Sequence, residues 1–473
     1  CAWEVTTVCS FALIGYTRTQ EAIDNANRQI VMNLIGGLAF VGALIWVSFV
    51  YGTIEFDKFI SSTLAYTQAG YTFMTVMPVM LLALAGFTKA AQMPFQSWLL
   101  GAMVAPTPTS ALLHSSTMVK AGVFLLIRLS PLMGTYLATG GNTTMLNPVG
   151  ISVMLVGATT FLVCSLIAIS QSNAKRVLAY STVANLGLIV TCAGIGTAAA
   201  VWAGVFLLIF HAVAKSLLFL CVGTAEHHIG SRDIESMDAL VSRMPKLACL
   251  MALGICGMSV APFGMLISKW AALGAFIDSG VLVLIVMMGF GSAATFFFWA
   301  KWLGKILCNV QGQDNLERDV HKSEWVALAV MAFGVVALAV ALPCVSSTIV
   351  TPYVKRLVGG SMLAPSLSDL TIMAVSAVVV VIVPLIVALR AKKRSTAVEM
   401  PHLGGVGLSQ TSFAGALGGE VSTAQRAWYM ESIFDEKQLS RIGSVVCILV
   451  ALAGIACSVG LSYVFINLMG SVI

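Results

Sequence analysis

The chain has 473 residues, of which 58% are hydrophobic and only 10% are charged. This composition excludes a soluble globular protein and predicts a multi-pass membrane protein. The net charge of +6 does not indicate a nucleic-acid partner, because the basic residues gather in loops between apolar stretches.

Apolar stretches along the chain predict an all-α membrane protein with about twelve transmembrane helices. The expected spans are 1–17, 30–51, 71–90, 107–130, 148–170, 175–195, 199–223, 247–275, 280–303, 324–347, 369–391 and 442–468. The first is shorter than the roughly 20 residues that a crossing requires, and the chain does not begin with methionine. We therefore expect an N-terminally incomplete copy of a longer protein.

Lysine and arginine are unevenly divided between the loops on the two sides. One set of loops carries Arg18, Arg28, Lys175, Arg176, Arg232, Arg243, Lys246, Lys301, Lys305, Arg318, Lys322, Lys392, Lys393 and Arg394. The opposite loops carry Lys58, Lys355 and Arg356. The positive-inside rule predicts that the first set is cytoplasmic and that both chain ends lie outside. Lys175 and Arg176, at the end of a span, are interpreted as a topology signal.

The segment 391–441 is a long connection late in the chain. Within it, 421–439 carries Trp428, Tyr429 and Phe434 among charged residues, which is typical of a short interfacial amphipathic helix. About 20 helical residues reach only about 30 Å, so this helix is too short to be a long lateral rod.

The eleven cysteines stand singly in apolar stretches, without a Cys-x-x-Cys pair. Their spacing argues against an iron–sulfur or nickel centre in this chain, and buried cysteines commonly act as small apolar side chains. The sequence also lacks a Walker loop and zinc-type ligand spacing, and its short Gly-x-Gly fragments do not lie between a strand and a helix. We expect no metal site and no cofactor in the chain itself.

Two lysines stand in apolar stretches that proline or glycine interrupts. Lys269 follows Pro262 and Gly264, and Lys89 precedes Pro94. A lysine at mid-membrane costs about 2.5–3.5 kcal/mol on insertion scales, so it requires a function. Interrupted helices at matching places in two halves line ion sites in transporter-like folds. Both lysines are therefore candidates for an ion path.

Two further spans each carry a histidine and a lysine. His114 and Lys120 lie on different helical faces, in a stretch that hydroxyl side chains make wettable. His211 and Lys215 are four residues apart and share one face, where a proton could pass directly or through one water. Because histidine titrates in the useful pH range, we interpret these groups as a proton relay. The alternative for His114 is a hydrogen-bonded structural group.

The first span holds an acidic residue, Glu4. A carboxyl group inside the membrane either pairs with a cation or stays protonated. A carboxyl group near the end of the chain can also be merely interfacial. The residues alone leave both interpretations open.

Five strings in residues 1–275 resemble one known family. They are Lys-Ala-Ala-Gln-Met-Pro-Phe-Gln-Ser-Trp-Leu (89–99), Ala-Pro-Thr-Pro-Thr-Ser-Ala-Leu-Leu-His-Ser-Ser-Thr-Met-Val-Lys-Ala-Gly-Val (105–123), Lys-Arg-Val-Leu-Ala-Tyr-Ser-Thr (175–182), Phe-His-Ala-Val-Ala-Lys-Ser-Leu-Leu-Phe-Leu (210–220) and Ile-Ser-Lys-Trp (267–270). These strings are similar to the antiporter-like proton-pumping subunits of respiratory complex I, Mrp-type cation/proton antiporters and membrane-bound nickel–iron (NiFe) hydrogenases.

The resemblance implies two inverted five-helix repeats with discontinuous helices at the two key lysines. The repeats would occupy 1–130, incomplete at its N-terminus, and 148–303, with C-terminal helices in 324–473. The resemblance also implies a row of proton-translocating groups along the membrane midplane. Matched motif by motif, these groups are Glu4, Lys89, His114, Lys120, His211, Lys215 and Lys269. One departure is Asn-Leu-Ile-Gly-Gly (33–37), where complex I relatives carry an arginine and an acid.

Within the family, Ser-Lys-Trp-Ala-Ala-Leu (268–273) looks most like the large membrane subunit of Ech-type energy-converting hydrogenases. That likeness implies translocation of H⁺, or of Na⁺, across a prokaryotic cell membrane, driven by ferredoxin and hydrogen chemistry. The chain would work with other membrane subunits and with soluble partners that hold the nickel–iron centre and the iron–sulfur clusters. The alternatives are an Mrp-type Na⁺/H⁺ antiporter subunit, an antiporter-like subunit of NADH–quinone oxidoreductase, and a scaffold whose buried charges specify packing.

A row of such groups can pass a charge change along the membrane. A unit charge arriving about 7 Å away alters the energy of a protonated site by about 2.4 kcal/mol at an effective dielectric constant near 20. Moving one proton against 100 mV costs about 2.3 kcal/mol. One or two such couplings therefore match the work of moving a proton.

Overall fold

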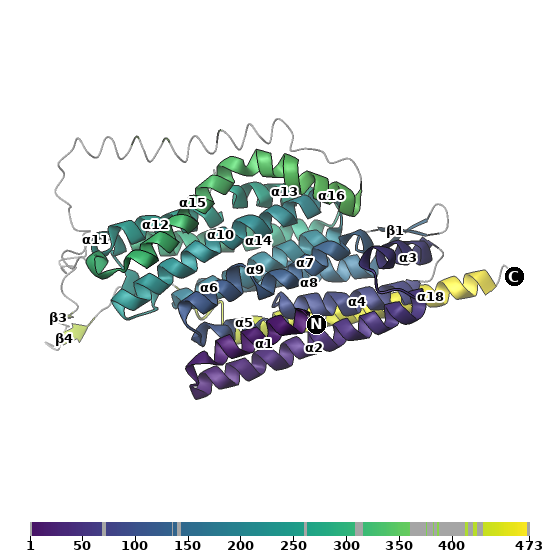
Figure 1. Ribbon diagram of the computed structural model, residues 1–473, viewed down its shortest axis with the longest axis horizontal. Coiled ribbons are helices and arrows are strands. Elements are labelled where there is room, and N and C mark those ends of the chain that lie inside the picture. Colours follow the sequence, from purple (N-terminus) through teal and green to yellow (C-terminus); the bar gives the residue numbers. More distant parts are fainter. Residues whose placement is uncertain are drawn as a thin grey trace.

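The computed structural model describes residues 2–68, 72–134, 136–139, 143–259, 263–307, 316–359, 412–414, 420–422 and 429–470, and the single positions 375, 382 and 386. The described chain is mostly helical, and its long helices run side by side along one direction (Figure 1). Nine helices in the described residues are long and apolar enough to cross a membrane. The prediction of an all-α membrane protein is therefore confirmed.

The first part of the chain forms a group of helices at one side of the molecule. Its elements are α1 (Ala2–Ile14), α2 (Gln20–Tyr51), α3 (Phe56–Gln68), α4 (Thr72–Lys89), α5 (Ser97–Gly101), α6 (Thr107–Ser115) and α7 (Met118–Leu129), followed by the antiparallel hairpin β1 (Tyr136–Thr139) and β2 (Thr143–Leu146). The boundaries of α2 follow from local chemistry, because the Thr19 hydroxyl accepts from the Ala22 amide at its start and Gly52 takes a left-handed conformation at its end.

The second part supplies the centre of the molecule. Its helices are α8 (Pro148–Ser170), α9 (Ala174–Ile195), α10 (Ala198–Ile229), α11 (Leu240–Arg243), α12 (Pro245–Ser259), α13 (Gly264–Asp278) and α14 (Leu282–Leu307). Side chains of Asn147, Asn173 and Thr197 accept hydrogen bonds from the first free amides of α8, α9 and α10. These polar caps explain why three long apolar helices begin sharply.

The last part of the chain folds back over the first two. It comprises α15 (Lys322–Val345), α16 (Thr351–Val358), the paired strands β3 (Ser412–Ala414) and β4 (Glu420–Ser422), and α18 (Glu436–Gly470). The expected span 369–391 lies outside the described residues, apart from three single positions. Where we expected an interfacial helix over 421–439, the described part shows the end of β4, a turn, and the first residues of α18.

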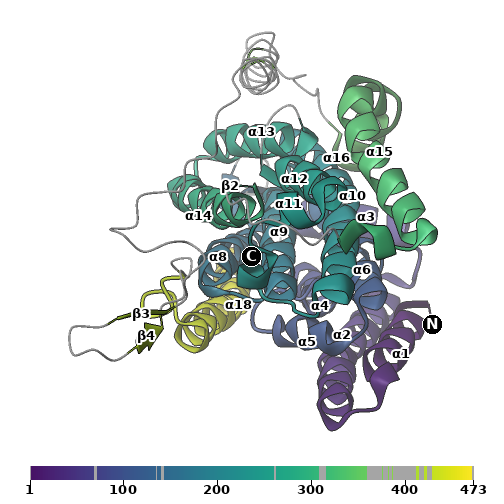
Figure 2. The same cartoon turned by 90° about the vertical axis from the view of Figure 1, so that its left-hand side faces the viewer.

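Helix α9 forms the core, and the end-on view places it near the centre of the bundle (Figure 2). The apolar stretch of α9 that is long enough to cross a membrane is completely buried by neighbouring helices. It packs closely on α8, where a Cβ atom added to Gly187 would lie 2.6 Å from the Gly157 carbonyl oxygen. Small residues let transmembrane helices approach in this way. On the outer surface, by contrast, side chains such as Phe49 and Phe333 are exposed, as expected for a face that meets lipid.

Helices are interrupted at three places that bear on function. α4 ends at Lys89, and irregular backbone follows as far as α5. α12 ends at Ser259 and α13 begins at Gly264, five residues before Lys269. A third interruption, inside the single span expected over 107–130, separates α6 from α7 at Ser116 and Thr117. Hydroxyl groups can satisfy backbone groups at such breaks, and the Thr117 hydroxyl donates to the Leu112 carbonyl.

Candidate functional site: a buried row of ionisable groups

At one end of the row, Lys89 reaches from α4 into α1. Its ammonium group is buried and donates to the Trp3 carbonyl at 2.9 Å, to the Thr6 hydroxyl at 3.2 Å and to the Thr7 hydroxyl. The same nitrogen lies 5.4 Å from the centroid of the Trp3 ring. The cation is therefore held by neutral oxygen atoms and an aromatic face.

Glu4 comes from α1, directly after Trp3. Its carboxyl group is packed against α2, because a Cβ atom added to Gly37 would lie 2.3 Å from Oε1. This Oε1 atom is buried without a hydrogen-bond partner. Among the ion pairs of the described residues, Glu4 is not joined to Lys89. Glycine at position 37 thus leaves space for the Glu4 carboxyl group.

The centre of the row is a contact between α7 and α10. Lys120 Nζ lies 2.6 Å from His211 Nδ1, and both side chains are buried. An ammonium group donates to Nδ1 only when that nitrogen carries no proton, so the two groups share one proton at this contact. The other ring nitrogen of His211 is buried without a partner.

Lys215 does not contact His211 directly, although the two share a helix face. Its ammonium group turns toward α9, where it donates to the Leu178 carbonyl at 2.9 Å and to the Ser181 hydroxyl. It also lies 5.1 Å from the centroid of the Trp299 ring. The i, i+4 spacing places both groups on one side of α10. Their contacts differ, because Lys215 binds α9 and His211 contacts Lys120 of α7.

His114, at the end of α6, is fully buried and packs against the Phe219 ring at 5.0 Å between centroids. Neither of its ring nitrogens makes a well-formed hydrogen bond. Both interpretations of His114, as a relay group and as a structural group, therefore stay predictions. The break between α6 and α7, at Ser116 and Thr117, lies between His114 and Lys120.

Lys269 forms the other end of the row, on α13. Its side chain lies over the Phe161 ring, 6.0 Å from the centroid. It also lines a cavity of about 250 Å³ between α13 and α14, together with Ser259, Ser292 and Thr295. Apart from Lys269 and these hydroxyl groups, the side chains that line this cavity are mainly apolar.

One polar cluster surrounds Lys175, the residue that we interpreted from the sequence as a topology signal. Lys175 is buried, with its side chain 1% exposed, and it pairs with Glu226 at 2.9 Å. Glu226 also accepts from the Thr107 hydroxyl at 2.9 Å and pairs with Arg232. The pairing has a physical reason: an unpaired lysine could not be buried there, and its partner comes from α10. The sequence signal that could have revealed this ion pair was Glu226, an acid in the last turn of the apolar helix α10.

The Lys175 cluster borders a cavity of about 600 Å³, which is also lined by Thr107, Thr224, His227 and Glu324. It lies where α6, α9, α10 and α15 come together.

Comparison with known proteins agrees with this arrangement. Residues 1–295 match the family described as NADH:quinone oxidoreductase/Mrp antiporter, transmembrane. The chain belongs to this family. The resemblance drawn from the five strings is therefore confirmed as membership of the antiporter-like proteins.

Two curated relatives show how far the likeness extends. The chain is 30% identical over 386 residues to the A1 component of a Na⁺/H⁺ antiporter of Staphylococcus saprophyticus, which covers 75% of this chain and 46% of the relative. It is 40% identical over 261 residues to the A/B component of a probable K⁺/H⁺ antiporter of Rhizobium meliloti, covering 55% and 25%. The match thus covers less than half the length of each of these relatives.

Solved structures share the fold. The chain aligns with a membrane-bound sulfane sulfur reductase, an archaeal respiratory membrane complex, at a TM-score of 0.66 and 22% identity, covering 75% of this chain and 70% of that one. It aligns with the Mrp complex of Dietzia sp. at a TM-score of 0.64 and 27% identity, covering 84% and 44%. Both neighbours are membrane complexes.

Proposed function

We propose that this chain moves protons across a prokaryotic membrane through the row Glu4, Lys89, His114, Lys120, His211, Lys215 and Lys269. The observation that carries the proposal is the 2.6 Å contact between Lys120 and His211, two ionisable groups from different helices inside an apolar core. Such groups are rare inside membranes and mark proton relays. At the two ends of the row, Glu4 has a free oxygen and Lys269 faces a cavity.

The test measures proton uptake by the native complex reconstituted in liposomes. We expect His211→Phe to abolish uptake, because it removes the proton acceptor of Lys120 while keeping an aromatic ring in the space. The matched control is Lys58→Ala, which removes an exposed lysine paired with Glu55. The proposal fails if the His211 variant pumps like the parent complex.

We further infer that the complex is an energy-converting hydrogenase. This inference rests on the string Ser-Lys-Trp-Ala-Ala-Leu at 268–273, in which Lys269 is followed by an aromatic and not by an acidic residue. In this proposal the redox centres belong to soluble partner subunits, and this chain contributes the membrane path. The basic loops would face those partners on the cytoplasmic side.

A second candidate is favoured by the curated relatives, which include a component of a Na⁺/H⁺ antiporter. In that case the chain would exchange Na⁺ for H⁺ with no redox partner. Metal analysis of the purified native complex separates the two. Stoichiometric nickel and iron support the hydrogenase, whereas a complex without them that acidifies liposomes only when Na⁺ is supplied supports the antiporter.

A further inference from the structure

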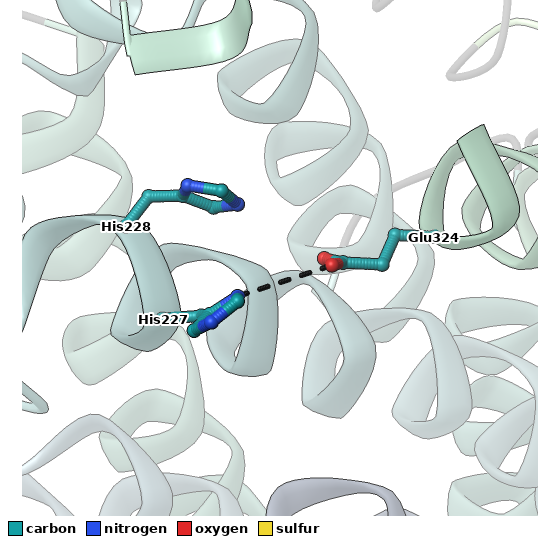
Figure 3. A group of neighbouring side chains, drawn as sticks. All are labelled: His227, His228 and Glu324. Atoms are coloured by element: carbon teal, nitrogen blue, oxygen red, sulfur yellow. Dashed lines mark ion pairs between the residues drawn. The ribbon is translucent and has the colours of Figure 1, made fainter. Parts of the chain in front are cut away.

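The C-terminal end of α10 and the start of α15 bring together three side chains outside the row. They are His227, His228 and Glu324, whose nearest ligand atoms all lie within 4.8 Å of one another (Figure 3). Figure 3 shows both imidazole rings extending from α10 on the side that faces the Glu324 carboxylate. We propose that these residues form a binding site for a divalent transition-metal ion of the Zn²⁺ class.

His227 and Glu324 form a long ion pair, drawn as a dashed line in Figure 3. His227 Nδ1 lies 4.0 Å from Glu324 Oε1, which is beyond hydrogen-bonding distance. Zinc binds imidazole nitrogen and carboxylate oxygen at about 2.0–2.2 Å, so an ion between the two atoms needs only a small closing movement. The other carboxylate oxygen is already oriented, since it accepts from the Thr224 hydroxyl at 2.8 Å.

His228 supplies an independent reason to expect a ligand. Its Nε2 atom is buried without a hydrogen-bond partner, and its ring lies 4.9 Å from that of His227 between centroids. A buried nitrogen that has lost its water is unfavourable unless something binds it. A metal ion held by His227 and Glu324 would satisfy that atom.

The donor set selects the metal. Two imidazoles and one carboxylate suit zinc and its neighbours among the first-row transition metals, and suit magnesium or calcium poorly. Three protein ligands leave a fourth position for water. His227 and Glu324 also line the cavity of about 600 Å³, so that position has access to solvent.

The site joins two parts of the chain that sequence spacing could not connect. The histidines lie within residues 1–295, which match the family, whereas Glu324 lies beyond them on α15. Our expectation of no metal site rested on local spacing, which does not register a ligand from a distant helix. Glu226, which pairs with Lys175 and Arg232, directly precedes His227, so an occupied site would place positive charge next to that cluster.

The experiment uses the native complex, stripped of metal with a chelator and titrated with Zn²⁺ against a chromogenic competitor. We expect one Zn²⁺ per chain, and we expect Glu324→Gln and His228→Asn each to weaken binding about ten-fold or more. The matched control is His321→Asn at the start of α15, where asparagine can still accept from the Ser323 amide. It should bind Zn²⁺ like the parent.

X-ray absorption of the bound zinc decides the ligands. Nitrogen and oxygen neighbours at about 2.0–2.2 Å support the site, whereas sulfur at about 2.3 Å would assign the ion to cysteines and overturn it. Equal binding by the parent and by a variant with all three residues changed would also overturn it. Should Glu324→Gln fail to fold, His227→Asn decides, because that side chain is 75% exposed and its loss should leave the fold intact.

Discussion

Among the described contacts, the three best-defined ammonium groups of the row are all held by neutral partners. Lys89 donates to a carbonyl and two hydroxyls, Lys215 to a carbonyl and a hydroxyl, and Lys120 contacts His211. Lys175, outside the row, instead pairs with the Glu226 carboxylate. A carboxylate partner would fix each lysine in its charged form, whereas neutral partners leave its proton free to respond to a neighbouring charge.

At Lys269 we predict that alanine abolishes proton translocation but leaves the complex assembled, because a small apolar side chain suits the span better than an ammonium group. Lys269→Arg should also fail, since guanidinium stays protonated. Losing a charge coupling of about 2.4 kcal/mol between neighbouring sites of the row should lower the rate of proton uptake roughly fifty-fold. Proton uptake in liposomes measures the effect, and size-exclusion chromatography checks assembly. Lost assembly with normal pumping per assembled complex would contradict the relay.

Between Glu4 and Lys89 we predict energetic coupling. Although the two groups form no direct ion pair, the Glu4 carboxyl group interacts electrostatically with the Lys89 ammonium group, so changing one charge should leave the other less well compensated. Glu4→Gln combined with Lys89→Ala should then be less harmful than the two single effects added together, by about 0.5–3 kcal/mol. The pumping rates of the parent, the two single variants and the double variant form a double-mutant cycle that measures the coupling. Strict additivity would mean that the two sites do not communicate.

Interrupted and closely packed helices determine where the row can run. The breaks between α6 and α7 and between α12 and α13 adjoin His114 and Lys269, in places where regular helices would leave no polar backbone available. Between these elements, α9 is buried and supplies the Leu178 carbonyl and Ser181 hydroxyl that hold Lys215. The position of α9 depends on glycines that face α8.

We predict that Gly187→Ala destabilises the protein by about 1–3 kcal/mol, because its methyl group would meet the Gly157 carbonyl oxygen at 2.6 Å. The matched control is Gly304→Ala on α14, where nothing lies within 4 Å of the added atom. Thermal unfolding in detergent should show a lower transition temperature for the first variant alone. Equal transitions would mean that the contact between α8 and α9 tolerates a wider separation.

The whole molecule closes by returning its C-terminal helix to the outer side of the bundle, where α18 stays mostly exposed (Figure 2). α18 packs along α8 and α4 (Figure 1). Glu436, at its start, pairs with Arg176 and accepts from Gln171, and the Gln96 amide donates to Ser440 at 2.6 Å. These contacts connect the segment after Lys89 to the end of the chain.

If the hydrogenase proposal holds, the membrane chain and the redox subunits should be separable in function. Hydrogen oxidation with an artificial dye, measured in detergent, should survive Lys89→Ala nearly unchanged, because this lysine lies within the helical bundle. Formation of a membrane potential by the same variant in liposomes should collapse. Loss of dye-linked activity with intact metal centres would show that the lysine acts directly on the redox site.

Much of the architecture could be predicted from the sequence. Long apolar segments indicated the helical membrane class, and family strings identified the buried groups, because both signals are local in the chain. Proline and glycine indicated the breaks after Lys89 and before Lys269. The break at Ser116 was not predicted, because the hydroxyl-rich stretch around it was interpreted only as wettable.

What the sequence by itself determined is which side chains are ionisable, which helices carry them and on which helical face they stand. The tertiary structure alone decided their partners: Lys120 with His211, Lys215 with Ser181, Lys175 with Glu226, and His228 near Glu324. The physical reason is that periodicity fixes the direction of a side chain about its own helix axis. The approach of a second helix, set by glycine contacts and interruptions far along the chain, determines what that side chain meets.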